Sequence, residues 1–308
     1  MPEFQLITDR LNFPEGPIAT SDGNVIVVEI RSGHLSRVDT SSGEITRLAE
    51  CRGGPNGAAV GPDGMIYVCN NGGFAWHEFD GMVAPGHQPD DYIGGRIQRV
   101  DPQSGKVEDV YDRAGAHPLK GPNDIVFDRA GGFWFTDLGK TRSRDMDLGG
   151  LYYARPDGSG IEEVVYGLVQ PNGVGLSPAG DRVYVAETGP GRVWAWNIDS
   201  PGHIAPAGLG PGGAELLWGF EGFQLLDSLG VDSEGNVCVA TLVTGAISVI
   251  SPDGKLTDQV SLPEHDVFVT NICFGGPDLR TAYITSSGRG RMYSTQWPVP
   301  GLQLAYGI

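Results

Sequence analysis

Six polar residues recur at one position of a repeated sequence pattern. In three places a Pro-Asn pair precedes an apolar run that ends at a turn rich in Gly, Asp and Ser. Matching positions elsewhere in the chain hold two acids and a threonine. A segment that recurs in this way is a structural unit. The six residues are Glu15, Asn56, Asn123, Asn172, Asp227 and Thr270.

These side chains supply the ligands that hard cations prefer. Five of them offer two carboxylates and three amide carbonyls, which suits Ca²⁺ first and Mg²⁺ or Mn²⁺ next. The absence of His and Cys from the set argues against a dedicated zinc cage, so Zn²⁺ and Fe²⁺ are weaker candidates. If the six positions converge, the sequence predicts a site for one divalent metal ion.

A turn is the alternative interpretation for two of the asparagines. Asn56 and Asn172 each precede glycine, and Asn tolerates the left-handed backbone of tight turns. Glu15 and Asp227 are harder to explain in this way, and Asp227 lies within the apolar stretch 225–231. A buried carboxylate needs a partner or a metal. The shared position in the repeat favours the metal site.

The elements that would position this ring are short β-strands. Val25 to Val28, Met65 to Cys69 and Phe133 to Thr136 are apolar runs bounded by Gly-rich turns, and the 48 glycines are spread along the chain. Six such units of four strands predict an all-β, six-bladed β-propeller with antiparallel blades. Residues 3–7 form a spare strand that would complete the last blade and close the ring. We expect one domain over residues 1–308.

Two connections are longer than a blade requires, and such loops are often functional. The aromatic content of residues 72–94, which include Trp76, predicts a packed rim or lid over the channel. Residues 139–149 could equally be a solvated insertion. His117 could also reach the mouth of the channel.

The composition of the chain limits the classes of molecule that it could bind. The net charge of -17 disfavours nucleic acid and anionic membranes. The four cysteines are far apart and predict buried thiols in a reducing compartment. No signal peptide or membrane span is evident, which predicts a cytoplasmic protein that acts on a small molecule.

The ordered motifs resemble the SMP-30/gluconolactonase/luciferin-regenerating-enzyme family over essentially the whole chain. The matching segments are residues 13–17, 122–124, 135–137, 171–173, 226–227, 274–278 and 282–285. The resemblance implies a six-bladed propeller with one divalent metal at its axis, and commonly the hydrolysis of sugar lactones. It also implies that Glu15, Asn172 and Asp227 are the core metal ligands.

The resemblance implies roles for a few further residues. Asn123 would be a further ligand or a substrate contact. Mammalian members carry Arg two residues before it, whereas this chain has Gly121 beside Lys120, which is more similar to the bacterial gluconolactonases. The candidate substrate contacts are Asn123, Asn56, Lys120, Trp76 and His117.

The predicted chemistry is metal-dependent lactone hydrolysis. The metal would polarise the carbonyl, and Asp227 would accept a proton from the attacking water as the catalytic base. Two alternatives use the same fold. One is a phosphotriesterase of the organophosphatase kind, which would need a wider and more apolar mouth. The other is a non-catalytic binding propeller in which the metal is structural.

Overall fold

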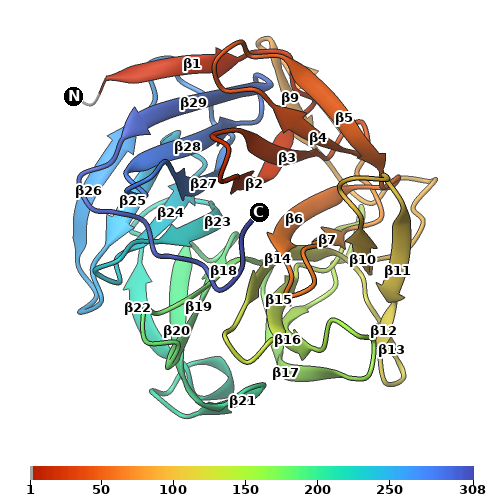
Figure 1. Cartoon of the computed structure of the whole chain (residues 1–308). Coiled ribbons are helices and arrows are strands. Elements are labelled where there is room, and N and C mark those ends of the chain that lie inside the picture. Colours follow the sequence, from red (N-terminus) through yellow and green to blue (C-terminus); the bar gives the residue numbers. More distant parts are fainter. Residues whose placement is uncertain (1–2) are drawn as a thin grey trace.

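The computed structural model describes residues 3–308, and these residues form six four-stranded or larger antiparallel sheets around one axis (Figure 1). The predicted six-bladed propeller is therefore confirmed. In these residues the only helical segment is a 3₁₀ turn at Pro211–Gly213. No helix in residues 3–308 has the length and apolar character needed to cross a membrane.

Each of the first three blades is a meander of four strands. Blade 1 contains β2 (Pro14–Ala19), β3 (Val25–Glu29), β4 (His34–Val38) and β5 (Ile45–Glu50). Blade 2 contains β6 (Pro55–Val60), β7 (Ile66–Asn70), β10 (Arg96–Val100) and β11 (Val107–Tyr111). Blade 3 contains β14 (Pro122–Phe127), β15 (Phe133–Asp137), β16 (Gly149–Ala154) and β17 (Ile161–Leu168).

The last three blades vary more. Blade 4 contains β18 (Pro171–Leu176), β19 (Arg182–Glu187), β20 (Arg192–Ser200), β21 (His203–Ala205) and β22 (Glu215–Gly219). Its outer position is shared, because β21 and β22 each pair with a different part of β20. Blade 5 contains β23 (Leu226–Val231), β24 (Val237–Thr241), β25 (Ala246–Ile250) and β26 (Leu256–Ser261). Blade 6 contains β27 (Val269–Gly275), β28 (Thr281–Ser286), β29 (Arg291–Gln296) and β1 (Phe4–Thr8).

The N-terminal strand closes the ring, as predicted. β1 pairs antiparallel with β29, and Phe4 lies opposite Thr295. The Phe4 ring also makes an edge contact with the Tyr293 ring, at 6.3 Å between centroids. Because β1 comes from the start of the chain and β29 from its end, this pairing removes what would otherwise be an open sheet edge.

All six inner strands share an irregularity at their first residues. In each, the register with the second strand shifts within the first half of the strand. Four of them begin with proline, which has no N–H for the ladder. A bulge at this place leaves the second residue of five of these strands outside the ladder, whereas in β2 the second residue, Glu15, still pairs with Val28 and the shift follows it. The repeat therefore delivers six polar residues to one end of the channel.

Buried polar residues at the ends of four second strands hold the loops that lead into the inner strands. Each accepts hydrogen bonds from backbone N–H groups of such a loop, with N···O distances of 2.6–3.0 Å. These contacts satisfy backbone donors that would otherwise be buried without partners. The acceptors are Glu29, Asn70, Asp137 and Glu187.

The apolar core lies between neighbouring blades. Phe133 of blade 3 contacts Tyr67 of blade 2, and Trp134 and Trp196 are fully buried between blades 3 and 4. The four cysteines form no disulfide, and all but the half-buried Cys273 are buried. This agrees with the prediction that they act as small apolar side chains.

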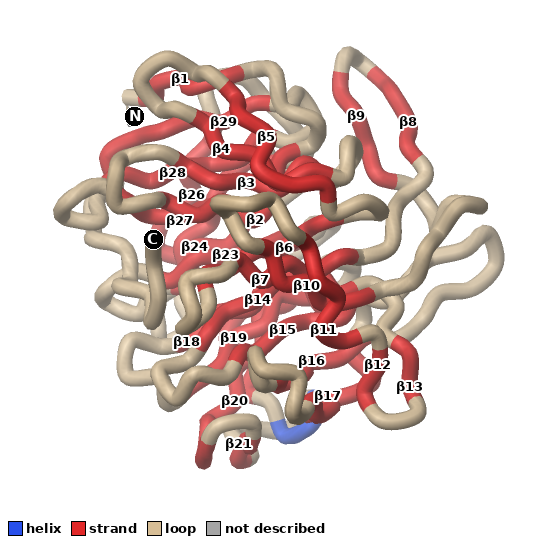
Figure 2. The backbone as a smooth tube through the Cα atoms, turned by 45° about the vertical axis from the view of Figure 1, so that its right-hand side comes forward, coloured by secondary structure: helices blue, strands red, loops and turns tan. Residues whose placement is uncertain are grey.

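The 72–94 connection contains a hairpin, β8 (Trp76–Phe79) and β9 (Met82–Pro85). Figure 2 shows this hairpin projecting from the molecule, away from the side on which the C-terminus lies. A short ribbon of β12 (Arg113–Ala114) and β13 (His117–Pro118) links blades 2 and 3 at the outer edge of the ring (Figure 1).

Candidate metal centre and its mouth

Each of the six repeated polar residues is the second residue of an inner strand. Five of the six are buried, and Asp227 is half-buried. Since all six inner strands run in the same direction along the axis, these residues form a ring at one end of the channel. We call this set the ligand ring.

Glu15 has one oxygen without a partner. Its Oε2 accepts from the backbone N–H of Gly16 and from Nδ2 of Asn271, both at 2.7 Å. Its Oε1 is buried and receives no hydrogen bond. Burial raises the pKa of Glu15 to about 7. A buried carboxylate oxygen with no donor is suited to a proton or a cation.

Two asparagines present amide oxygens in the same ring. Oδ1 of Asn123 is buried without a partner. Asn172 donates from Nδ2 to Oγ1 of Thr188 at 3.2 Å, which turns its Oδ1 the other way. The contact from Ser228 Oγ to that oxygen is long, at 3.5 Å. Both amide oxygens are therefore available to a ligand.

Asp227 and Asp124 add negative charge to the site. Burial, followed by repulsion from Glu15, raises the pKa of Asp227 well above its usual value and that of Asp124 to about 8. Asp124 accepts from the backbone N–H groups of Ile125 at 2.9 Å and Val174 at 3.2 Å. Among the salt bridges of residues 3–308, none involves these three carboxylates.

Sequence reasoning assigned no role to Asp124. The signal was present in the repeat, because the residue after the ring position is glycine in Gly16, Gly57 and Gly173 but an acid here. A Cβ atom on Gly57 would lie 2.9 Å from Oδ1 of Asp124, which shows how closely the blade 2 strand approaches this carboxylate.

The donor set fits a hard divalent cation. In residues 3–308 no three His, Cys, Asp or Glu side chains converge as a metal-binding group. The candidate ligands are instead two carboxylates and two amide oxygens, and two of these four residues carry an unpaired buried oxygen. Oxygen donors of this kind suit Ca²⁺ or Mg²⁺ better than Zn²⁺.

Thr270 and Asn56 are the two remaining members of the ligand ring. Oγ1 of Thr270 bonds the hydroxyls of Thr285 at 2.9 Å and Ser287 at 2.5 Å. Ser287 in turn donates to the carbonyl oxygen of Pro14. Thr270 thus braces the residue before Glu15. Asn56 is only 5% exposed, at the start of β6.

A chain of aromatic rings borders the ligand ring. Phe13, two residues before Glu15, packs against Trp76 at 5.2 Å and against Phe268 at 5.7 Å between ring centroids. Phe74 extends the chain from Trp76 at 6.2 Å, and Phe79 extends it from Phe268 at 6.3 Å. We call these five residues the aromatic arc. The 72–94 connection therefore packs beside the mouth through Phe74 and Trp76, whereas its tip at residues 77–81 is exposed.

Phe13 has an unusual backbone. Its φ is 57°, in the left-handed region that non-glycine residues rarely adopt, and proline follows it. Gln170, which precedes Pro171, has the same feature, with φ of 54°. Strain of this kind persists where the surroundings enforce it, and it is common at functional sites.

The central channel continues below the ligand ring as a cavity of about 470 Å³. The later residues of the inner strands line it, and residues 302–307 line its far end. Figure 1 shows the C-terminus near the axis. The mouth with the aromatic arc and this C-terminal end of the cavity therefore lie on opposite faces.

A model of the SMP-30/gluconolactonase/LRE-like region matches residues 13–288. The chain belongs to this family. It is 25% identical to a gluconolactonase of Zymomonas mobilis over 92% of this chain and 79% of that protein. It is 28% identical to the lactonase drp35 of Staphylococcus saprophyticus over 82% of this chain and 70% of that protein.

A solved structure shows the same fold. The calcium-binding protein regucalcin from Agrobacterium tumefaciens superimposes with a TM-score of 0.74 at 17% identity, covering 98% of each chain. At this level of sequence identity the similarity shows a shared fold only.

The position of Gly121 is too crowded for a larger side chain. A Cβ atom on Gly121 would lie 2.5 Å from the carbonyl oxygen of Gly139, so an arginine would require the backbone to move. The neighbouring Lys120 is exposed, and its backbone N–H donates to Asp137 at 2.7 Å. This member of the family has no guanidinium at that position.

His117 is not brought to the ligand ring. It is exposed on β13, which lies at the outer edge of the ring (Figure 1). Its place in the fold therefore gives no support to the prediction that it contacts the substrate. The reason is that the 112–121 connection crosses from the outer strand of blade 2 to the inner strand of blade 3, and His117 falls on its outer part.

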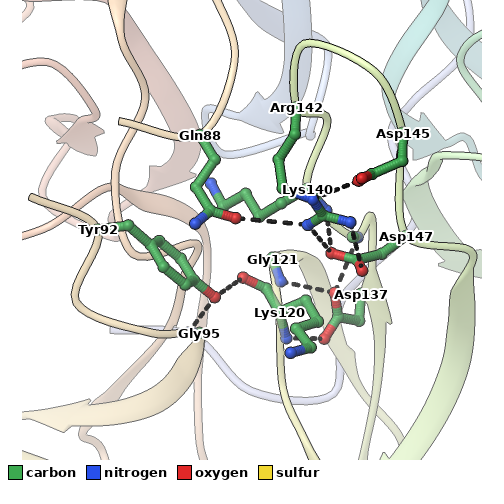
Figure 3. Close-up of polar contacts among 11 residues, drawn as sticks. Gln88, Tyr92, Gly95, Lys120, Gly121, Asp137, Lys140, Arg142, Asp145 and Asp147 are labelled. Carbon is green, nitrogen blue, oxygen red and sulfur yellow. Dashed lines mark hydrogen bonds and ion pairs between the residues drawn. The ribbon is translucent and has the colours of Figure 1, made fainter. Parts of the chain in front are cut away.

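The 139–149 connection is packed at its two ends, whereas residues 143–146 and 148 are exposed, so the interpretation as a solvated insertion holds only for its middle part. It contacts the 72–94 connection where the backbone N–H of Gln88 donates to the carbonyl of Thr141 at 2.8 Å. Arg142 forms a two-point ion pair with Asp147, at 2.9 and 3.0 Å (Figure 3). The pairing of Arg142 with Asp147 could not be predicted from the sequence, because it depends on how the connection folds.

Proposed function

We propose that this protein is a metal-dependent lactone hydrolase that opens sugar lactones. The observation that carries this proposal is the ligand ring, in which buried oxygens of Glu15 and Asn123 have no hydrogen-bond partner among residues 3–308. The gluconolactonase and lactonase relatives support the reaction class. The calcium-binding neighbour supports a divalent ion, with Ca²⁺ as the first candidate.

Four residues would hold the ion. Glu15 and Asp227 contribute charge, and the amide oxygens of Asn123 and Asn172 complete the set. When bound, a divalent cation supplies Lewis acidity toward the lactone carbonyl. It also offsets the repulsion among the buried carboxylates.

Asp227 would serve as the base. It is the ring carboxylate that is half-buried, whereas Glu15 is 2% exposed and already receives two hydrogen bonds. Asp227 accepts a proton from water as the water oxygen bonds to the carbonyl carbon. The ring C–O bond then breaks, the leaving oxygen takes the proton from the protonated Asp227, and the product is a hydroxy acid.

Residues around the mouth would orient the lactone. Asn56 and Asn123 lie in the ligand ring, Trp76 lies in the aromatic arc, and Lys120 is exposed on the loop before β14. Their different chemistry would provide hydrogen bonds on one side of the substrate and an apolar surface on the other.

The test uses chelator-treated protein reloaded with one metal at a time. Acid release from glucono-δ-lactone and other aldonolactones is followed at constant pH, with the spontaneous rate subtracted. We expect no activity in chelator and restoration by Ca²⁺ or a similar ion. Equal rates with and without metal, or no lactone opened under any metal, would refute the proposal.

The aromatic arc favours one second candidate, a phosphotriesterase that uses the same ligand ring. Its five rings provide an apolar surface beside the site, which such substrates require. An aryl phosphotriester belongs in the same assay. A protein that binds the metal and hydrolyses none of these compounds would instead be a binding propeller.

A further inference from the structure

Lys140 is a charged side chain that is almost fully enclosed by protein. It is 2% exposed, and its Nζ donates to Oδ1 of Asn71 at 3.2 Å and to the carbonyl of Gly73 at 2.7 Å. The same nitrogen lies 4.0 Å from the centroid of the Phe74 ring and 5.5 Å from that of Tyr92. An ammonium has three N–H donors. Two of them have oxygen acceptors here, and the Phe74 ring is close enough for a cation–π contact.

No carboxylate pairs directly with this ammonium in residues 3–308. The nearby Asp137 accepts from the backbone N–H groups of Lys120, Gly121 and Gly139. The other nearby acid, Asp147, is paired with Arg142. Burial lowers the pKa of Lys140 to about 7, and these two acids oppose the shift only in part.

The contacts of Lys140 join the two long connections at the mouth. Lys140 belongs to the 139–149 connection, whereas Gly73, Phe74 and Tyr92 belong to the 72–94 connection. The hydroxyl of Tyr92 also donates to the carbonyl of Lys120 at 2.6 Å (Figure 3). Lys140 is thus the buried centre of the interface between the two connections.

From Lys140 a continuous line of contacts leads to the ligand ring. The ammonium lies on the Phe74 ring, Phe74 packs on Trp76, and Trp76 packs on Phe13. Phe13 precedes Pro14 and Glu15. A change at Lys140 would therefore reach the aromatic arc first, without touching a candidate metal ligand.

We propose that Lys140 is a positioning residue for substrate specificity. It holds Phe74, and through Phe74 the Trp76 ring, against the mouth, so that the aromatic arc is a preformed wall for the substrate. The effect on substrate rests on the lactone hydrolase function proposed above. The fixing of the 72–94 connection does not depend on that function.

The test compares Lys140→Met with Lys106→Met. Methionine keeps the length and the apolar stem but removes the donors and the charge. Lys106 is an exposed lysine paired with Glu108, so its substitution is a matched control. Residues 72–94 contain no Lys or Arg but several aromatic residues, so chymotrypsin and not trypsin reports on this connection.

For Lys140→Met we expect cleavage within 72–94 to be roughly 3- to 30-fold faster, the range that corresponds to losing one partly buried cation–π contact. KM for the lactone should rise by a similar factor, with kcat and Ca²⁺ affinity unchanged, because binding and not chemistry is affected. Lys140→Arg should recover part of both effects, since it keeps a cation over the ring. Lys106→Met should resemble the unaltered protein.

Two results would overturn the proposal: unchanged cleavage and KM in Lys140→Met, or a fall in kcat with KM unaltered. If Lys140→Met does not fold, Phe74→Leu removes the ring under the ammonium at little cost in volume, and the same pattern is expected. If the unaltered protein opens no lactone, the proposed function fails. The cleavage comparison then still decides whether Lys140 fixes the connection.

Discussion

Glu15, Asp124 and Asp227 share one end of the channel. Burial raises the pKa of each, and repulsion from Glu15 adds to the shift of Asp124 and Asp227. A cluster of this kind is costly as three charges unless a cation or protons neutralise it. Oxygens without partners beside it, on Glu15 and Asn123, make a cation the better explanation. Both the cost of the buried charges and the unpaired oxygens thus indicate a cation site at this end of the channel.

Asp227→Asn separates the two roles proposed for this residue. The amide keeps an oxygen of similar shape but loses one charge and the ability to accept a proton. At saturating metal we expect kcat to fall by roughly 10²- to 10⁴-fold, the usual contribution of a positioned base. Metal affinity, measured by titration calorimetry, should weaken without vanishing because three other ligands remain.

Glu15→Gln is the control for that prediction. Glu15 is already held by Gly16 and Asn271, so it would act as a ligand and not as a base. Added metal should therefore restore most of its activity. If added metal restores Asp227→Asn equally well, Asp227 is a ligand only and the base is another group.

At the scale of elements, the β8–β9 hairpin is the part of the structure most closely tied to the mouth. Its first residue, Trp76, contacts Phe13, and the backbone N–H of Val83 donates to the carbonyl of Gly288 in blade 6 at 2.7 Å. Arg31 of blade 1 pairs with Glu78 on the exposed side. The hairpin is thus anchored to two blades beyond its own.

We expect Trp76→Ala to raise KM or change the order of preferred lactones while leaving Ca²⁺ affinity nearly unaltered. The reason is that the indole borders the mouth but offers no ligand to the ion. Steady-state kinetics on several lactones would measure the effect. Trp218→Ala is a suitable control, since Trp218 is half-buried on the outer strand β22. Equal kinetic changes in both variants would argue against a lid.

The N-terminal strand β1 is expected to contribute to the stability of the whole propeller because it completes blade 6. Deleting residues 1–8 removes four paired positions from β29, each contributing roughly 0.5–1.5 kcal/mol through its hydrogen bonds. We expect the free energy of unfolding to fall by about 2 to 6 kcal/mol, measured by urea denaturation. Deleting residues 1 and 2 alone leaves the β1 pairing intact. A full deletion with unaltered stability would contradict closure by this strand.

At the scale of the whole molecule, the buried carboxylates link stability to pH. In the metal-free protein the pKa of Glu15 is about 7 and that of Asp124 about 8, both above their ordinary values of 4.5 and 3.8. The folded state therefore holds protons that the unfolded chain releases. The resulting stability is complete below the unfolded pKa values and is lost as pH rises through the folded ones.

We accordingly expect the melting temperature in chelator to fall between about pH 5 and about pH 7, since above that pH the lowered pKa of Lys140 acts in the opposite direction. Exposed carboxylates with lowered pKa, such as Asp39, act below this window and do not obscure the trend. Saturating Ca²⁺ should flatten the dependence, since the ion replaces the protons, and Ca²⁺ affinity should rise with pH. Calorimetry with and without Ca²⁺ would measure this, and a rising melting temperature in chelator would contradict it.

The sequence by itself determined the propeller and the membership of the ligand ring. Both follow from a repeat, because equivalent positions of six like units must converge where their inner strands meet. Glu15, Asn56, Asn123, Asn172 and Asp227 could be assigned in this way without knowledge of a single contact. The spare strand at residues 3–7 was likewise evident from counting strands.

The tertiary structure alone decided which groups are free, which are paired and which are absent from the site. Asn172 presents its oxygen because Thr188 takes its nitrogen, and Lys140 is enclosed because Phe74 and Tyr92 come from another connection. His117 lies outside because of the path of its loop. Such outcomes depend on neighbours brought together by folding from distant parts of the chain. A repeat pattern specifies positions along strands but not these partners.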